Sequence, residues 1–216
     1  MIFSIRNRAD EIGFLISRLL SLSKIPLAEF RGLGLNLPSM ESSTEYLVVS
    51  GSLRSKSRSR EMAHFLTDCY RSEGIVAQTI DLRDLPLPFC DGEAAYDDRS
   101  VLTVSKTISE ARVVIIATPI YNFDASAALK NLIELTGESW EDKVVGFLCA
   151  AGGSMSYMSV MSLANSLMLD FRCLIIPRIV YATSQDFTDG CLSSSEVRER
   201  VRELAVASTR IRNSSV

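Results

Sequence analysis

From Tyr46 to the end of the chain, short β-branched segments alternate with longer segments of helical periodicity. The short segments predict five strands, over residues 46–50, 76–81, 113–118, 144–150 and 174–180. The longer ones predict helices over residues 59–73, 101–111, 125–136, 157–170 and 194–210, with Gly74 and Gly137 placed to end two of them. Alternating strands and helices are typical of a parallel sheet covered on both faces. We therefore predict a doubly wound α/β fold of five parallel strands in the order 2-1-3-4-5.

Residues 1–43 do not follow this alternation, and we interpret them as an N-terminal extension, helical or poorly ordered, before a single domain of residues 44–216. Apolar residues at helical spacing predict one short amphipathic helix there, which would dock on the domain or on a partner subunit: Ile12, Leu15, Ile16, Leu19 and Leu20. A start of translation at Met40 is an open alternative.

Composition excludes several classes of function. Lys and Arg number 23 against 26 Asp and Glu, so a net charge of −3 provides no broad positive surface for nucleic acid or an anionic membrane. The longest apolar runs, such as residues 113–117, are far shorter than the roughly 20 residues that cross a bilayer, so no membrane span is expected.

The five cysteines contain no C-x-x-C pair, and with His64 as the single histidine we expect no metal site. We interpret the cysteines as reduced, buried small hydrophobes in a cytoplasmic protein: Cys69, Cys90, Cys149, Cys173 and Cys191. His64, on the first predicted helix, is interpreted as structural, which leaves a serine-histidine triad little support.

The loop after the first strand has the composition of a phosphate site. Ser52, Ser57 and Ser59 supply hydroxyl groups, Arg54 supplies a guanidinium group, and the free N–H groups of a helix start follow directly. In an acidic protein an anion must be neutralised at the point of contact. The alternative is that these serines cap the helix beside solvated basic residues, but the position between a strand and a helix favours the phosphate site.

Two further loops follow the third and fourth strands. Pro119 is expected to stop its strand, which frees the peptide groups that follow, from Ile120 on, to turn toward the edge of a ligand. Tyr121 and Phe123 bring flat apolar surface and Asn122 a donor and an acceptor, which suits a planar heterocycle, although Tyr121 and Phe123 could instead simply cover the end of the sheet. Gly152 and Gly153 allow a backbone to approach a ligand closely, although a Gly-Gly pair alone is usually a flexible turn. Because the carboxyl ends of parallel strands share one edge, we expect all three loops to meet.

Common nucleotide motifs are absent. The sequence contains neither G-x-x-x-x-G-K-[ST] nor G-x-G-x-x-G, which disfavours ATP chemistry and ordinary dinucleotide binding. Asp81 ends the second predicted strand, and without those glycines we assign it a solvated or capping role.

Four motifs in this order resemble the NADPH-dependent FMN reductase family, whose flavodoxin-like members include flavin, quinone, chromate and azo-dye reductases. They are Gly51-Ser52-Leu53-Arg54-x-x-Ser57, Thr118-Pro119-x-Tyr121-Asn122, Leu129-Lys130-Asn131 and Gly152-Gly153. The resemblance runs from about Tyr46 to the end of the last helix and does not include the first 43 residues.

The resemblance implies FMN as cofactor and NADPH or NADH as hydride donor, with ping-pong transfer through the flavin to free FMN, a quinone or another small electrophile. It places the FMN phosphate on Ser52, Arg54, Ser57 and Ser59. The ring would be bordered by six residues: Pro119, Ile120, Tyr121, Asn122, Gly152 and Gly153. It requires no catalytic side chain, because the chemistry belongs to the cofactor. It also implies a homodimer or homotetramer.

The sequence also departs from the family pattern. Many members have an acid at the position of Ile120, a glycine at the position of Phe123, and more glycines around the position of Met155. The larger side chains of Phe123 and Met155 are expected to narrow the site for the electron acceptor. Two other functions stay open on sequence alone: a flavodoxin-type electron carrier, disfavoured by the mild net charge, and a flavin-free regulatory or binding module.

Overall fold

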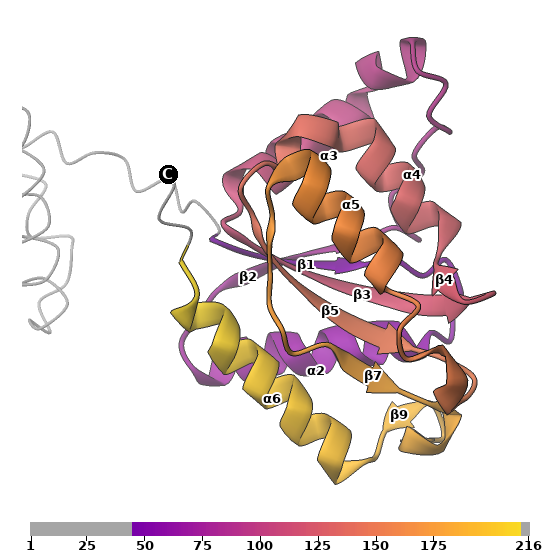
Figure 1. The fold of residues 1–216 in the computed structure, drawn as a ribbon, viewed down its shortest axis with the longest axis vertical. Helices are drawn as coiled ribbons and strands as arrows, with labels where there is room; N and C mark the ends of the chain where they lie inside the picture. Colours follow the sequence, from indigo (N-terminus) through magenta and orange to yellow (C-terminus); the bar gives the residue numbers. More distant parts are fainter. Residues whose placement is uncertain (1–44, 213–216) are drawn as a thin grey trace, which may run out of the picture. The chain divides into compact units, whose positions relative to one another are not determined.

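The computed structural model describes residues 45–212 (Figure 1). The predicted N-terminal extension, its amphipathic helix and the alternative start at Met40 lie outside the described residues.

A mostly parallel sheet forms the centre of the domain. Its main strands are β1 (Tyr46–Ser50), β2 (Ala77–Asp81), β3 (Val113–Tyr121) and β5 (Val144–Ala150), in the order β2-β1-β3-β5. The fifth position is shared by β6 (Leu174–Ile175) and β7 (Val180–Ala182), which both pair with β5 in parallel. The predicted order is confirmed.

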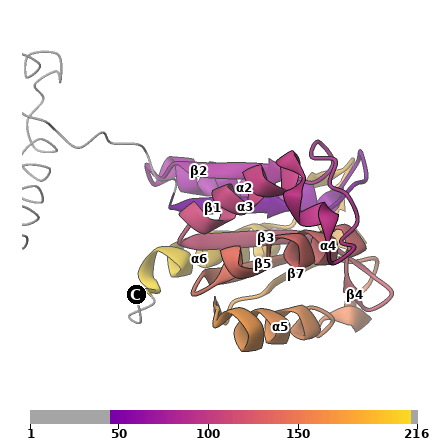
Figure 2. The ribbon, with the colours of Figure 1, turned by 90° about the horizontal axis from the view of Figure 1, so that it is seen from above.

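Helices cover both faces of this sheet (Figure 2). On one face lie α2 (Arg58–Ser72) and α6 (Ser195–Arg210). On the other lie α3 (Arg99–Glu110), α4 (Ala127–Thr136) and α5 (Met161–Phe171). Successive residues of each central strand face opposite layers, so that Val48 packs with α2 and α6 while Val49 packs with α3, α4 and α5. The doubly wound fold class is confirmed.

Short elements connect these layers. The 3₁₀ turns are η2 (Ala94–Asp97), η3 (Gly137–Trp140), η4 (Ser154–Ser156) and η5 (Ser184–Asp186). The short strand β4 (Asp124–Ala125) folds back on β3, and β8 (Phe187–Thr188) pairs with β9 (Cys191–Leu192) in a separate ribbon.

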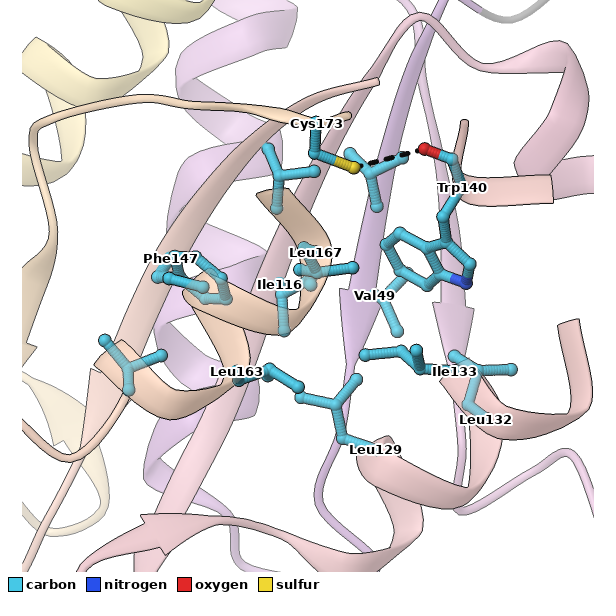
Figure 3. Close-up of a cluster of buried hydrophobic side chains, with 14 of the residues drawn as sticks. Val49, Ile116, Leu129, Leu132, Ile133, Trp140, Phe147, Leu163, Leu167 and Cys173 are labelled. Carbon is cyan, nitrogen blue, oxygen red and sulfur yellow. Dashed lines mark hydrogen bonds between the residues drawn. The ribbon is translucent and has the colours of Figure 1, made fainter. Parts of the chain in front are cut away.

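The core under α4 and α5 contains the single tryptophan (Figure 3). Trp140 is fully buried, and its indole Nε1–H donates to Thr136 Oγ1 at 2.8 Å. The thiol of Cys173 donates to the Trp140 carbonyl oxygen at 3.1 Å. A buried polar group without a partner destabilises a fold by about 1–3 kcal/mol, and these two bonds avoid that cost.

Helix ends follow ordinary capping chemistry. The side chains of Ser57, Ser126 and Ser194 accept backbone N–H groups at the starts of α2, α4 and α6. Gly74 follows the end of α2 with φ +72°, and Gly137 caps α4 with φ +26°, as the sequence predicted.

Pro119 does not stop its strand, contrary to prediction, and β3 continues to Tyr121. The Ala117 carbonyl accepts from Gly51 N–H, so the backbone groups of Ala117, and of Pro119 two residues on, face the β1 side. Because β1 ends at Ser50, opposite Ala117, the N–H group that proline lacks has no acceptor to lose.

The single strand predicted over residues 174–180 is wrong as well. The chain leaves the sheet after β6, and Arg178 N–H donates to the Ile176 carbonyl at 2.7 Å around Pro177. Proline cannot donate to a sheet ladder, which explains the break between β6 and β7. The helix predicted from Tyr157 begins only at Met161, after η4 and a further turn.

The cysteines divide by burial. Cys149 and Cys173 are buried as predicted, Cys69 and Cys90 are half-buried, and Cys191 is exposed, so the prediction of a buried residue is wrong for Cys191. No helix within residues 45–212 has both the length and the apolar character needed to cross a bilayer.

Candidate functional site

A pocket of about 630 Å³ lies at the carboxyl ends of β1, β3 and β5. Its walls come from three loops: the first loop (residues 51–57) with the start of α2, the end of β3 with the second loop (residues 122–123), and the third loop (residues 151–153). All predicted site residues except Gly153 line it: Ser52, Arg54, Ser57, Ser59, Pro119, Ile120, Tyr121, Asn122 and Gly152. The volume is within the range usual for small-molecule and cofactor sites.

Another hollow, of about 410 Å³, lies along α6 and is lined by alternating acidic and basic side chains, including Glu199, Arg202 and Glu203. It contains none of the predicted site residues and does not lie at the strand ends, where doubly wound folds bind ligands.

The first loop is held by its own serines. Ser52 is buried, and its Oγ accepts from Arg54 N–H at 3.3 Å. Ser57 caps α2 by accepting from Arg60 N–H at 3.3 Å, and its Oγ lies 3.0 Å from Ser59 Oγ. Ser57 is therefore a capping residue and also part of the pocket wall, so the two interpretations of this serine are compatible.

Positive charge gathers where the first loop meets α2. Arg54, Lys56 and Arg58 line the pocket, and its described lining includes no carboxylate. The Arg58 guanidinium also lies 5.8 Å from the centre of the Phe187 ring. This end of the pocket suits an anion.

A buried ion pair lies behind the first loop. Arg60 on α2 bonds both carboxylate oxygens of Asp81, which ends β2 opposite Ser50 of β1. The same guanidinium donates to the carbonyl oxygens of Ser52, Arg54 and Ser55. Sequence reasoning missed Arg60, because its partner Asp81 lies 21 residues away and no local pattern signals the pair.

Asp81 is mostly buried and has two roles. It is the ion-pair partner of Arg60, and its Oδ1 accepts a hydrogen bond from Arg83 N–H at 3.0 Å, which caps that turn. The solvated role assigned to it is therefore wrong, and the capping role is confirmed. Burial by itself raises the pKa of Asp81, but the hydrogen bonds from Arg60 and from Arg83 N–H outweigh it, so the pKa lies below its ordinary value.

The second loop is the tip of a tight hairpin between β3 and β4. Ile120 lies opposite Ala125 and Tyr121 opposite Asp124, which leaves Asn122 and Phe123 as the two turn residues. Both have positive φ, 50° and 65°, as two-residue hairpin turns of this kind require. Asparagine tolerates this region well and phenylalanine poorly.

Two bulky residues behave differently from expectation. The side chains of Phe123 and Met155 are exposed and lie outside the lining of the pocket. Tyr121, which does line it, is about half exposed at 53%.

The third loop is held by side chains from the strand and turn beside it. Tyr181 on β7 donates its hydroxyl to the Gly153 carbonyl at 2.5 Å, and Ser184 donates to the Gly152 carbonyl at 3.0 Å. Ala150, Ala151 and Gly152 face the pocket, while Gly153 lies just outside it. Ala150 and Ala151 were not predicted, since nothing in an alanine pair distinguishes it in the sequence.

These features fit FMN. The pocket offers hydroxyl groups, N–H groups at a helix start and cations at one end, and a tyrosine, an asparagine and backbone without large side chains at the other. No cluster of His, Cys, Asp and Glu among the described residues could hold a metal ion. His64 is exposed on α2 and does not line the pocket.

The motif Leu129-Lys130-Asn131 lies on α4, outside the pocket. Leu129 is fully buried, and the Asn131 amide group accepts from Cys90 N–H at 2.9 Å and donates to the Pro88 carbonyl at 2.8 Å. This motif therefore secures the core and the segment after β2.

Comparison with known proteins agrees with this geometry. The sequence profile of the NADPH-dependent FMN reductase family matches residues 44–188. A NAD(P)H-dependent FAD/FMN reductase of Geobacillus thermodenitrificans is 33% identical over 132 residues, which cover 59% of this chain and 71% of that protein. An NADPH azoreductase of Bacillus sp. is 26% identical over 163 residues, 73% of this chain and 89% of that protein.

Solved structures show the same fold. FerB, a flavoenzyme NAD(P)H:(acceptor) oxidoreductase of Paracoccus denitrificans, superposes with a TM-score of 0.62 at 20% identity, covering 75% of this chain and 93% of that one.

Proposed function

The chain belongs to the NADPH-dependent FMN reductase family, and from this premise we propose that its pocket binds FMN with the phosphate at the α2 end and the ring between the second and third loops. The phosphate ligands would be Ser52, Arg54, Ser57 and Ser59. The observation that carries the proposal is that loops far apart in sequence bring a cationic end and a flat, apolar end into one pocket.

The chain is an NAD(P)H-dependent flavin oxidoreductase, and bound FMN supplies the hydride chemistry. The protein's own part is to bind and orient. Pro119, Ile120 and Tyr121 would border the ring with strand backbone, and the backbone at Asn122 and Gly152 would place N–H dipoles at its polar edge. The described lining residues include no His, Cys, Asp or Glu, so none of these side chains is offered as the proton donor or acceptor in this pocket.

We propose free FMN, a quinone or another small electrophile as acceptor. Relatives are described as azoreductases and as quinone oxidoreductases, and the half-exposed Tyr121 leaves the ring end of the pocket accessible to a planar molecule. Rates of oxidation of NADPH and of NADH, measured with the same acceptors, determine which hydride donor the protein prefers.

We also propose that the protein is a homodimer or homotetramer in the cytoplasm. Each chain would consist of an N-terminal extension, residues 1–43, and the flavin-binding domain. The start of the family match at residue 44 supports the division. The five free cysteines support a reducing compartment. Light scattering after size exclusion that gives a mass of about 24 kDa, the mass of one chain, would contradict an oligomer.

The test is an absorbance titration of the purified protein with FMN, followed by NADPH without oxygen and then by an acceptor. We expect a saturable spectral change of the flavin, loss of its colour with NADPH, and steady NADPH oxidation once a quinone or free FMN is added. A protein that stays colourless after FMN addition and dialysis would refute the proposed site. Flavin binding without NADPH or NADH oxidation would instead indicate an electron carrier.

A further inference from the structure

Arg60 has a complete set of hydrogen-bond partners behind the first loop. A guanidinium group has five N–H donors. Nε bonds Asp81 Oδ2, and Nη2 bonds Asp81 Oδ1 at 3.1 Å and the Ser52 carbonyl at 2.8 Å. Nη1 bonds the carbonyl oxygens of Arg54 at 2.7 Å and Ser55 at 3.1 Å. Every donor is therefore used inside the protein.

These bonds set the direction of the loop's N–H groups. In a trans peptide unit the C=O and the following N–H point in opposite directions, and the described chain contains no cis peptide bond. With the carbonyls of Ser52, Arg54 and Ser55 turned toward Arg60, the N–H groups of the next residues, at positions 53, 55 and 56, point away from it. Within residues 45–212, no hydrogen bond from these three groups to the protein is found.

Arg60 itself does not reach the pocket. It is absent from the described lining, its side chain is only 10% exposed, and its charge is balanced by Asp81. Arg54 and Lys56, which belong to the loop that it holds, do line the pocket. The influence of Arg60 on an anion must therefore pass through the loop backbone.

We propose that Arg60 is a positioning residue for the cofactor phosphate: it holds the first loop with its N–H groups facing the anion, and Asp81 fixes the guanidinium in that orientation. The inference rests on the proposed placement of FMN. It predicts that Arg60 acts on the phosphate end of the ligand and leaves the ring end unaffected.

Lysine cannot replace Arg60 in this arrangement. An ammonium group keeps the positive charge but has three donors at one point, whereas the acceptors here surround a planar fork. Arg60→Lys therefore separates the geometry of the loop from the charge behind it.

The experiment compares dissociation constants for FMN and riboflavin, which differ by the phosphate, using quenching of flavin fluorescence at constant ionic strength. The variants are Arg60→Lys and Asp81→Asn, with Arg71→Met as a matched control that removes an exposed guanidinium from the far end of the same helix. Thermal unfolding of each protein without flavin reports whether it folds.

We expect the wild type and Arg71→Met to bind FMN at least about tenfold more tightly than riboflavin. In Arg60→Lys this preference should fall about tenfold, and in Asp81→Asn about threefold, while affinity for riboflavin changes less than about twofold. A general loosening of the fold would instead weaken both ligands together.

Suppose that the wild type prefers FMN. Variants that keep the full preference, or that bind both ligands equally less tightly, then overturn the role of Arg60 and leave the proposed phosphate site standing. A wild type that binds both ligands equally overturns the phosphate site and this inference with it. If Arg60→Lys does not fold, Asp81→Asn decides by the same ratio.

Discussion

Adding one methyl group at Gly152 tests whether the backbone of the third loop touches the flavin ring. A Cβ at this position would meet no protein atom within 4 Å, and its φ lies outside the left-handed region, so Gly152→Ala introduces no strain in the free protein. Because alanine restricts the unfolded chain, we expect unfolding to become harder by about 0.4–1 kcal/mol. Gly152 lines the pocket, so we expect the added methyl group to occupy space that the ring would need.

Inserting a methyl group into a well-packed contact typically costs about 1–3 kcal/mol. At 1.4 kcal/mol for each factor of ten, Gly152→Ala should weaken FMN and riboflavin alike by roughly 5- to 150-fold. Gly153→Ala is the matched control, because Gly153 has extended backbone, φ −152° and ψ −178°, and lies outside the pocket lining.

Flavin titrations and urea unfolding of both variants complete the test. We expect neither variant to be less stable than the wild type, and flavin affinity to fall only in Gly152→Ala. Wild-type affinity in Gly152→Ala, or a larger loss in Gly153→Ala, would refute the placement of the ring against the third loop.

Further predictions concern charge, pH and thiols. Arg54→Ala should weaken FMN binding by about 1.5–3 kcal/mol in the same titration, with riboflavin binding and unfolding unchanged. The folded-state pKa of Asp81 lies below its ordinary value of 3.8, so its ion pair stabilises the fold above that pH and is lost as the pH falls through the folded value. Urea unfolding of the wild type and of Asp81→Asn measures this effect. The difference between their free energies of unfolding should be constant from about pH 5 to 8 and shrink below pH 3.8. Burial raises the pKa of the Cys149 thiol to about 12 and that of the Cys173 thiol to about 11. A thiol reagent at pH 8 should therefore label the exposed Cys191 first, and Cys149 and Cys173 only when the protein unfolds. Early labelling of Cys149 would contradict the packing around it.

The main strands and most of the pocket could be predicted from the sequence because both depend on local patterns, and the sheet order followed from the match of five alternating strands and helices to the doubly wound fold. Alternation of apolar runs defines β1, β3 and β5, and loops at the ends of parallel strands must meet at one edge. Serine, arginine and glycine are also distinctive in composition, so most of the residues that line the pocket stood out.

The parts that were missed depend on contacts between distant residues. The pairing of Arg60 with Asp81, 21 residues apart, follows from the register of β2 beside β1, which no local pattern reveals. The course of β3 past Pro119 depends on where the neighbouring strand ends. The break at Pro177 was obscured by the apolar residues on both sides of Pro177 and Arg178.

That break has a consequence for self-association. The segments β6 and β7, two and three residues long, form one border of the sheet and offer a neighbouring molecule only brief stretches of unpaired backbone, too short to template a continued ladder. Copies that meet at this border therefore have to be joined through side chains on the helical faces or the loops, whereas β2 forms the opposite border of the sheet with five residues. At the border formed by β6 and β7, the same interruption guards the free protein against the strand-to-strand pairing that leads to fibres.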